Sequence, residues 1–215
     1  EERVPMCGVP HHAVDIYVDK LIKQGFKVAI CEQLEDPKTA KGIVKRDVTE
    51  VISSGTIISS NSLDEKTNNY IGSIYDYEYC YSIVYTDITT GELYAEIIPH
   101  DNDKLINDIL SFGLKEVVVN KEVNTSIINL LKEQYHLTVT LVNNILETDE
   151  YKFCYKGITD SRYITSIKHL LYYLVINQKR SLGHLQKVII NETDNFLKMD
   201  IHTKRNLELT ESIRL

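Results

Sequence analysis

The order of hydrophobic periods after Tyr70 is the sequence feature that most limits how this chain can fold. Three apolar runs that alternate with polar residues lie close together between Tyr70 and Ile98, with the turn Thr90-Gly91 before the last of them. Connections this short join antiparallel strands. From Asp103 to Leu141 the period changes, and helical segments alternate with short apolar strands. Such a strand–helix–strand run predicts right-handed parallel crossovers.

The strongest helical pattern begins at Ser161. Its apolar residues recur at helical spacing, and Lys179-Arg180 suit the negative end of the helix dipole. The apolar stripe consists of Ile164, Ile167, Leu171, Leu174 and Val175. The element order is therefore βββαβαβα, which predicts an α/β domain with a mixed sheet flanked by helices, as in the ribonuclease H-like fold.

A smaller α/β unit is predicted before this domain. Residues 13–24 have helical spacing and are followed by Gly25, where a left-handed C-cap belongs. Residues 27–31 and 43–52 have the patterns of strands, and the unit closes at residues 53–56, Ser-Ser-Gly-Thr. Polar residues then replace the periodicity over residues 57–69, which predicts a linker.

These patterns divide the chain into a first unit of residues 1–56, a linker of 57–69, and a sheet domain of 70–182. Residues 183–215 are expected to begin a helical domain, since Asp200 to Leu215 has the start of another helical pattern. The chain begins without methionine and stops inside that pattern, so we interpret it as a piece of a longer protein.

The composition is that of an acidic protein without a nucleic-acid footprint of its own. The 215 residues carry a formal net charge of −7, whereas a dedicated DNA-binding domain is usually basic. No apolar run approaches the roughly 20 residues that span a bilayer, and no signal-peptide pattern opens the chain. The four cysteines are scattered, as expected of reduced thiols in a cytoplasmic protein.

The loop PMCGVPHH near the start raises the question of a metal or nucleophile site, because Cys7 stands close to His11 and His12. Zinc needs three or four converging ligands, and no second paired cluster has ligand spacing. A thiol nucleophile needs a base and an orienting third group, which the sequence does not identify. A structural or contact loop is favoured, and metal binding and thiol catalysis stay open.

A metal-dependent nuclease is the other enzyme class to weigh. It would need several carboxylates on the first and fourth strands of the sheet domain and on a late helix. The first strand has no acid in its middle, the fourth ends in Asn120, and Asp87 is explained more simply as a turn residue. No phosphate-binding glycine motif occurs either. We therefore expect no catalytic, metal or cofactor-binding residues in this chain.

The order of motifs resembles the bacterial MutS family over the whole chain. Residues 5–56 resemble the second half of its mismatch-recognition domain, with a P-M-x-G-[VI]-P-x-H loop, an A-I-C-E-Q strand and a closing G-T. The linker ending and the Thr90-Gly91 turn are similar to the connector domain, and YYLVINQKRSLGHL to its last helix. Residues 199–209 are similar to the start of the lever domain. Ser54 stands where the family has proline in T-P-G-T, which is expected to loosen the turn.

The resemblance implies a part of a protein that recognises mismatched or looped DNA and starts mismatch repair in an ATP-dependent way. The family's Phe-x-Glu wedge would precede Glu1, and its ATPase domain, with ATP and magnesium, would follow Leu215. The connector would relay signals and dock a MutL-type partner, and the parent protein is expected to be a homodimer with no membrane contact.

Within this chain the resemblance makes the PMCGVPHH loop a DNA contact on the minor-groove side. Met6 would give an apolar contact, Gly8 would allow close approach of the backbone, and His12 could meet phosphate. Lys45 and Arg46 on the basic strand are weaker candidates. A stand-alone ribonuclease H-like nuclease and a protein-interaction module without a DNA role remain the alternatives.

Overall fold

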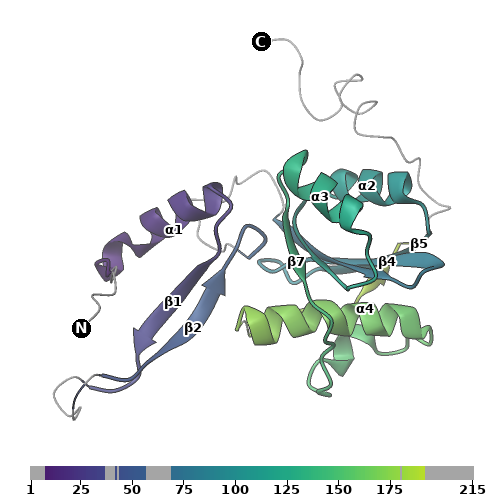
Figure 1. Ribbon diagram of the computed structural model, residues 1–215. Coiled ribbons are helices and arrows are strands. Elements are labelled where there is room, and N and C mark those ends of the chain that lie inside the picture. Colours follow the sequence, from purple (N-terminus) through teal and green to yellow (C-terminus); the bar gives the residue numbers. More distant parts are fainter. Residues whose placement is uncertain (1–7, 37–41, 43, 57–68, 180, 192–215) are drawn as a thin grey trace.

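The computed structural model describes residues 8–36, 42, 44–56, 69–179 and 181–191. A hairpin unit, formed by the described residues up to Thr56, begins with a 3-10 turn (His11–Ala13) and helix α1 (Val14–Lys23). The antiparallel strands β1 (Val28–Gln33) and β2 (Arg46–Ile52) follow (Figure 1). Gly25, with φ of 83°, adopts the left-handed conformation predicted after the helix.

The hairpin unit has little core of its own. Among its described hydrophobic residues, only Val18 and Ile22 of α1 are buried. Several large apolar side chains on or beside α1 are instead exposed, namely Ile16, Tyr17, Leu21 and Phe26. Two buried side chains are too few to hold a two-stranded sheet and a helix independently, so this unit depends on further contacts.

The sheet domain, residues 69–179 and 181–191, contains a mixed six-stranded sheet in the order β7-β6-β3-β4-β5-β8. Strands β3, β4 and β5 form the predicted antiparallel meander, while β6, β7 and β8 each lie parallel to a neighbour. Their bounds are β3 (Tyr70–Asp76), β4 (Cys80–Asp87), β5 (Leu93–Pro99), β6 (Leu114–Val119), β7 (Thr138–Leu141) and β8 (Ile189–Ile190). The predicted α/β class and mixed sheet are confirmed.

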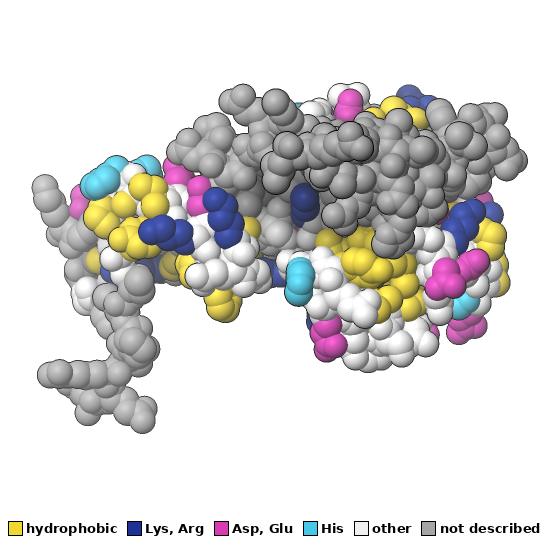
Figure 2. Space-filling model, turned by 90° about the horizontal axis from the view of Figure 1, so that it is seen from above, with side chains coloured by type: hydrophobic (Ala, Val, Ile, Leu, Met, Phe, Trp, Pro, Cys, Tyr) yellow, Lys and Arg dark blue, Asp and Glu magenta, His cyan; other side chains and the backbone are white. Residues whose placement is uncertain are grey.

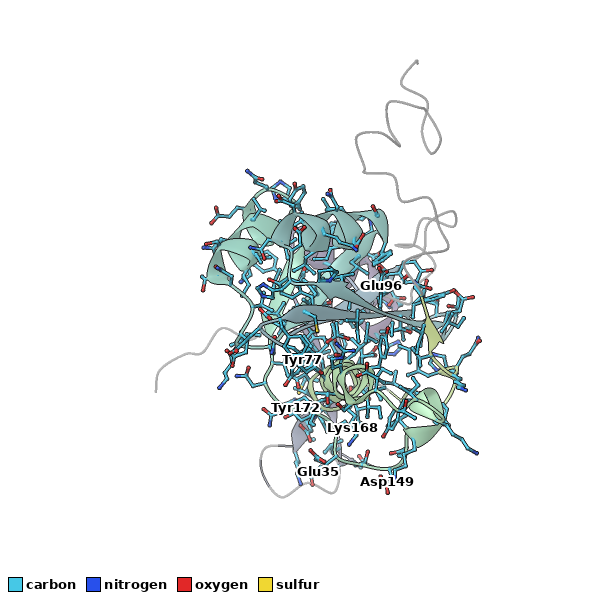
Figure 3. The ribbon with its side chains drawn as sticks, turned by 90° about the vertical axis from the view of Figure 1, so that its right-hand side faces the viewer. Glu35, Tyr77, Glu96, Asp149, Lys168 and Tyr172 are labelled. Atoms are coloured by element: carbon cyan, nitrogen blue, oxygen red, sulfur yellow. The ribbon has the colours of Figure 1, made fainter. Side chains whose placement is uncertain are left out.

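Helices cover both faces of this sheet (Figures 1 and 3). On one face α2 (Asn102–Ser111) and α3 (Thr125–Glu133) bury a cluster that includes Leu105, Ile109 and Leu131. On the other face α4 (Ser161–Tyr172) buries a second cluster through Ile167 and Leu170. The three helices begin at polar N-cap side chains that accept backbone N–H bonds, supplied by Asp101, Asn124 and Asp160.

The C-terminal end of α4 differs from the sequence expectation. The helix passes into a π-helical turn over Tyr173–Asn177, a form that is rare and often found at functional positions. Lys179 was expected to stabilise the helix dipole. Instead its backbone turns to a φ of 54° and its Nζ donates to the carbonyl of Val48 on β2 at 2.6 Å. Arg180 lies outside the described residues.

The packed sheet domain also continues past the expected boundary at Leu182. Leu185 and Val188 are buried in the α4-side cluster, and β8 pairs with β5. The Asn191 amide extends this pairing by donating to the carbonyl of Ala95 at 2.8 Å. Residues 183–191 therefore belong to this domain, and the expected helix over residues 200–215 lies outside the described residues.

A buried imidazole joins α4 to the sheet. His169 is fully buried, and since the Val142 carbonyl only accepts, its Nε2 must carry the proton of that 2.8 Å bond. Its Nδ1 then accepts the hydroxyl proton of Ser73 on β3, 2.7 Å away. Burial lowers the pKa of His169, so the neutral ring is the form that fits the core.

Protonation of His169 should destabilise the fold in mild acid. Its folded-state pKa lies below the unfolded value of about 6.5, so the unfolded chain takes up the proton first as pH falls. We expect protonation of His169 to lower the free energy of unfolding by up to about 1.4 kcal/mol per pH unit below about pH 6.5. Urea unfolding at pH 7 and pH 5 measures it, with His169→Gln as the comparison. An equal acid loss in that variant would contradict the assignment.

Gly91 and Gly113 allow the cost of a left-handed backbone to be measured separately from the cost of steric crowding. Gly91 has φ of 75°, and an added Cβ would lie 2.5 Å from the carbonyl oxygen of His184. Gly113 has φ of 71° and no atom within 4 Å of an added Cβ. We expect Gly113→Ala to cost about 1–2 kcal/mol of stability from backbone conformation alone, and Gly91→Ala at least about 1 kcal/mol more from overpacking. Equal losses of stability for the two variants in urea unfolding would contradict the overpacking, because they would show that the segment around His184 moves aside at no cost.

Candidate nucleic-acid interface

The described DNA-contact candidates all lie on the hairpin unit. Gly8 and His12 precede α1, and Lys45 and Arg46 lie at the start of β2. The N-terminal end of α1 and the tip of the β1–β2 hairpin both point away from the six-stranded sheet (Figure 1). Met6 lies outside the described residues. The fold thus places the two groups of candidates at the same end of one unit.

The surface at the start of α1 is open and partly apolar. Gly8 and His12 are exposed, and an added Cβ on Gly8 would meet no atom within 4 Å. The 3-10 turn is closed by the Ala13 amide, which donates to the Pro10 carbonyl at 2.9 Å. Figure 2 shows histidine and hydrophobic side chains side by side over this end of the hairpin unit. Within the part of the chain that the structure describes, nothing requires glycine at position 8, so the space above it is open to a partner.

The start of β2 is less cationic than its sequence alone indicates. The Lys45 amide donates to Glu35 Oε1 at 2.6 Å, and Arg46 pairs with Gln33 across the hairpin. Exposed carboxylates lie on the same stretch of the two strands, namely Glu32, Glu35, Asp36 and Asp47. These negative charges reduce the local attraction for phosphate, so Lys45 and Arg46 are weaker candidates than Gly8 and His12.

A buried carboxylate at the opposite end of the hairpin unit connects it to the sheet domain. Glu116 on β6 is fully buried, and its Oε1 lies 3.2 Å from the Nζ of Lys27, just before β1. Its Oε2 accepts from the Ser53 hydroxyl and from the Gly55 amide at 3.2 Å, both just after β2. Both ends of the hairpin thus contact one acid. We call Glu116 and the residues that contact its carboxylate the Glu116 junction.

The π-helical turn after α4 completes this junction. The Tyr173 hydroxyl donates to Glu116 Oε1 at 2.6 Å and accepts from Lys27 Nζ at 2.7 Å and from Gln178 Nε2 at 2.6 Å. Burial, and then the negative charge of Glu116, raise the pKa of the Tyr173 hydroxyl, which keeps it protonated as a donor. Gln178 also accepts, through its backbone carbonyl, from the Val51 amide at 3.3 Å.

The closing turn of the hairpin unit is held tightly, contrary to the expectation that Ser54 in place of proline loosens it. Ser54 Oγ lies 2.9 Å from Thr138 Oγ1 and 3.2 Å from the Lys115 carbonyl, so the substitution adds contacts to the sheet. An added Cβ on Gly55 would lie 2.9 Å from the Cβ atoms of Glu116 and Ile71. Glycine is required there by close approach rather than by backbone conformation.

Sequence reasoning predicted the loop of Gly8 and His12 as a candidate DNA contact, which stays a prediction, and it did not predict the Glu116 junction. The available signal was an acid inside the apolar run of residues 114–119, since a charged residue in a buried strand needs partners. Neither Lys27 nor Tyr173 could be assigned to it, because both lie far away along the chain.

The residues considered for a nuclease site, Asp87 and Asn120, make hydrogen bonds that stabilise the fold. Asp87 Oδ1 accepts from the Thr89 amide at 2.8 Å and its Oδ2 from the Asn69 amide at 3.1 Å, which fits its predicted role in the turn. Asn120 exchanges two hydrogen bonds with the backbone of Asp76. Within the described ranges, no group of three or more His, Cys, Asp or Glu side chains is arranged to hold a metal ion.

Comparison with known proteins shows similarity along the whole chain. A family model described as MutS domain I matches residues 1–61, and one described as MutS domain II matches residues 69–186. The DNA mismatch repair protein MutS of Listeria welshimeri is 44% identical over 100% of this chain, which covers 25% of that protein. The protein of the same name from Bacillus licheniformis is 40% identical over 99% of this chain, which covers 24% of it. The chain thus spans about a quarter of the length of these relatives.

No helix in the described part of the chain is both long and apolar enough to cross a membrane.

The exposed position of Gly8 gives a test of the DNA-contact assignment. In a longer protein that contains this chain, Gly8→Ala should leave stability within about 0.5 kcal/mol of the wild type, because the added Cβ meets open space. If DNA lies against this backbone, affinity for mismatched duplex should fall about fivefold, the value of one lost contact of about 1 kcal/mol.

The matched control is Gly183→Ala, since Gly183 also has no atom within 4 Å of an added Cβ and lies in the sheet domain. Fluorescence anisotropy with labelled mismatched duplex measures both variants. Equal affinity for Gly8→Ala and Gly183→Ala would remove Gly8 from the interface.

Proposed function

We propose a function from one premise, that the chain belongs to the MutS family of DNA mismatch-repair proteins. The observation that carries the proposal is that both family domains match in order and that the similarity to MutS proteins extends over the whole chain. The chain is accordingly a fragment of a protein that binds mismatched double-stranded DNA and starts its repair.

Within that protein we assign the hairpin unit to the supporting half of the mismatch-recognition domain. Gly8 and His12, with Met6 beside them in sequence, would lie against the minor-groove side of the DNA, and Lys45 and Arg46 would contribute less. The exposure of Gly8 and His12 at the end remote from the sheet supports this assignment. The proposed chemistry is recognition of DNA shape.

The sheet domain would be the connector, which relays the state of the DNA site toward an ATPase domain elsewhere in the protein. ATP and magnesium would bind there, since this chain has no phosphate-binding glycine motif to hold them. We further propose that the connector docks a MutL-type partner, that the protein is a homodimer and that it is cytoplasmic. The domain division proposed from sequence remains a proposal, with the sheet domain extended through residue 191.

Binding of mismatched duplex by the longer protein tests the function. We expect it to bind a duplex with one mismatch or a small loop more tightly than the matched duplex, with affinity falling as salt rises. The isolated 215-residue chain should bind both weakly, because its net charge of −7 disfavours phosphate contact. Sub-micromolar, mismatch-selective binding by the isolated chain would show that the reading surface lies entirely within it.

Equal affinity of the longer protein for mismatched and matched duplex would contradict the proposal and favour the interaction-module alternative. Magnesium- or manganese-dependent DNA cleavage by this chain that Asp87→Asn abolishes, without unfolding it, would instead establish the nuclease alternative.

A further inference from the structure

The hairpin unit contacts the sheet domain through Lys27, through strand β2 and through its closing turn. A groove of roughly 550 Å³ separates the C-terminal end of α1 from α3 and β7, and its walls include Lys23 on one side and Lys132 on the other. Beside this groove the closing turn of the hairpin unit and Lys27 reach the sheet domain. Because this groove lies between α1 and α3, the orientation of the hairpin unit depends on the residues beside it that do touch.

The Glu116 junction fastens the hairpin at two points. Lys27 precedes β1 and the Ser53–Gly55 turn follows β2, so one carboxylate binds the base of both strands. Oε1 pairs with Lys27 and accepts a hydrogen bond from Tyr173, and Oε2 accepts hydrogen bonds from the closing turn. A unit held at two points on opposite strands cannot rotate about either point without breaking the other contact.

Strand β2 is also aligned along its length by the segment after α4. Lys179 donates to the Val48 carbonyl at 2.6 Å, and the Val51 amide donates to the Gln178 carbonyl at 3.3 Å. Thr56 Oγ1 donates to Gln178 Oε1 at 3.3 Å. These contacts fix the direction of β2 relative to α4 and hence the direction in which the hairpin tip points.

Loosening the junction gradually is unfavourable. Glu116 is fully buried on the sheet, so withdrawal of Lys27 and the closing turn would leave a buried negative charge without its cation and two of its donors. The hairpin unit therefore either keeps this orientation or leaves it in one step.

We propose that Glu116 is a positioning residue for DNA reading, which holds the end that carries Gly8 and His12 in one direction relative to the connector. This inference rests on the proposed function for its consequence in DNA binding, but the orientation itself can be measured without DNA. Coupling between two sites in proteins typically amounts to a 5- to 150-fold change in affinity, which sets the scale of the expected effect.

The variant that tests this is Glu116→Gln. The side chain keeps its shape and an oxygen for Tyr173, but its amide group cannot accept from the Gly55 amide and carries no charge for Lys27. Ser53→Ala is the second variant, because it removes one donor from the hairpin unit and changes no residue of the sheet domain. Glu122→Gln is the matched control, an exposed acid on the same domain that pairs only with Lys121 among the salt bridges described.

Distances between spin labels report the orientation. One label is placed on the exposed Cys31 of β1 and one on Lys152→Cys of the sheet domain, in a Cys7→Ser background, while Cys80 and Cys154 are buried. We expect one narrow distance distribution for the wild type and for Glu122→Gln, and a broad or shifted one for Glu116→Gln and Ser53→Ala. Urea unfolding followed in the same samples shows whether the sheet domain stays folded.

In the longer protein, Glu116→Gln and Ser53→Ala should lower mismatch affinity at least about fivefold and matched-duplex affinity less than about twofold. Unchanged distance distributions in both variants would overturn the positioning role, and so would a broadened distribution with unchanged mismatch affinity. Failure of the wild-type protein to prefer mismatched duplex would count against the proposed function instead, and leave the measured orientation effect standing. If Glu116→Gln does not fold, the distance distribution and the mismatch affinity of Ser53→Ala test the positioning role.

Discussion

A carboxylate in a protein interior requires charge compensation and hydrogen bonds on both of its oxygens. Glu116 obtains them from Lys27, from Tyr173 and from the turn that closes the hairpin unit. These groups are distant in sequence, so the requirement of one side chain brings together the start of β1, the end of β2 and the end of α4. The hairpin unit, with two buried hydrophobic residues in its described part, Val18 and Ile22, depends on this contact for its place in the molecule.

The fold of the sheet domain could be predicted from sequence because its signals are local. Alternating residues give the meander, helical spacing gives α2, α3 and α4, and short connections give the antiparallel pairing of β3, β4 and β5. The two-residue strand β8 could not be predicted, since Ile189 and Ile190 are too few to form a pattern. The π-helical turn was also missed, because its residues have the same apolar spacing as the helix before it.

The candidate interface could likewise be predicted only in part from the sequence. The position of Gly8 and His12 before a helix follows from the loop sequence and the apolar spacing behind it. Lys45 and Arg46 are weaker candidates from sequence as well, but the structural reason could not be predicted, because the sequence of one strand gives no account of the acids that the hairpin brings beside these cations. Glu35 lies ten residues before Lys45 along the chain, yet its carboxylate accepts the Lys45 amide. Charge at an interface is a property of paired strands and cannot be read from one of them.

Strand β8 has a consequence for how the connector meets other molecules. Its two residues pair with Tyr94 and Ala95 of β5, and the Asn191 amide continues the pairing. Without them, part of the β5 backbone would face solvent with unpaired amides and carbonyls, and such edges recruit strands from other chains. The segment that leaves the domain therefore also shields it from self-association. A connector shortened to end at Leu182 would lose this shield together with the buried side chains of Leu185 and Val188.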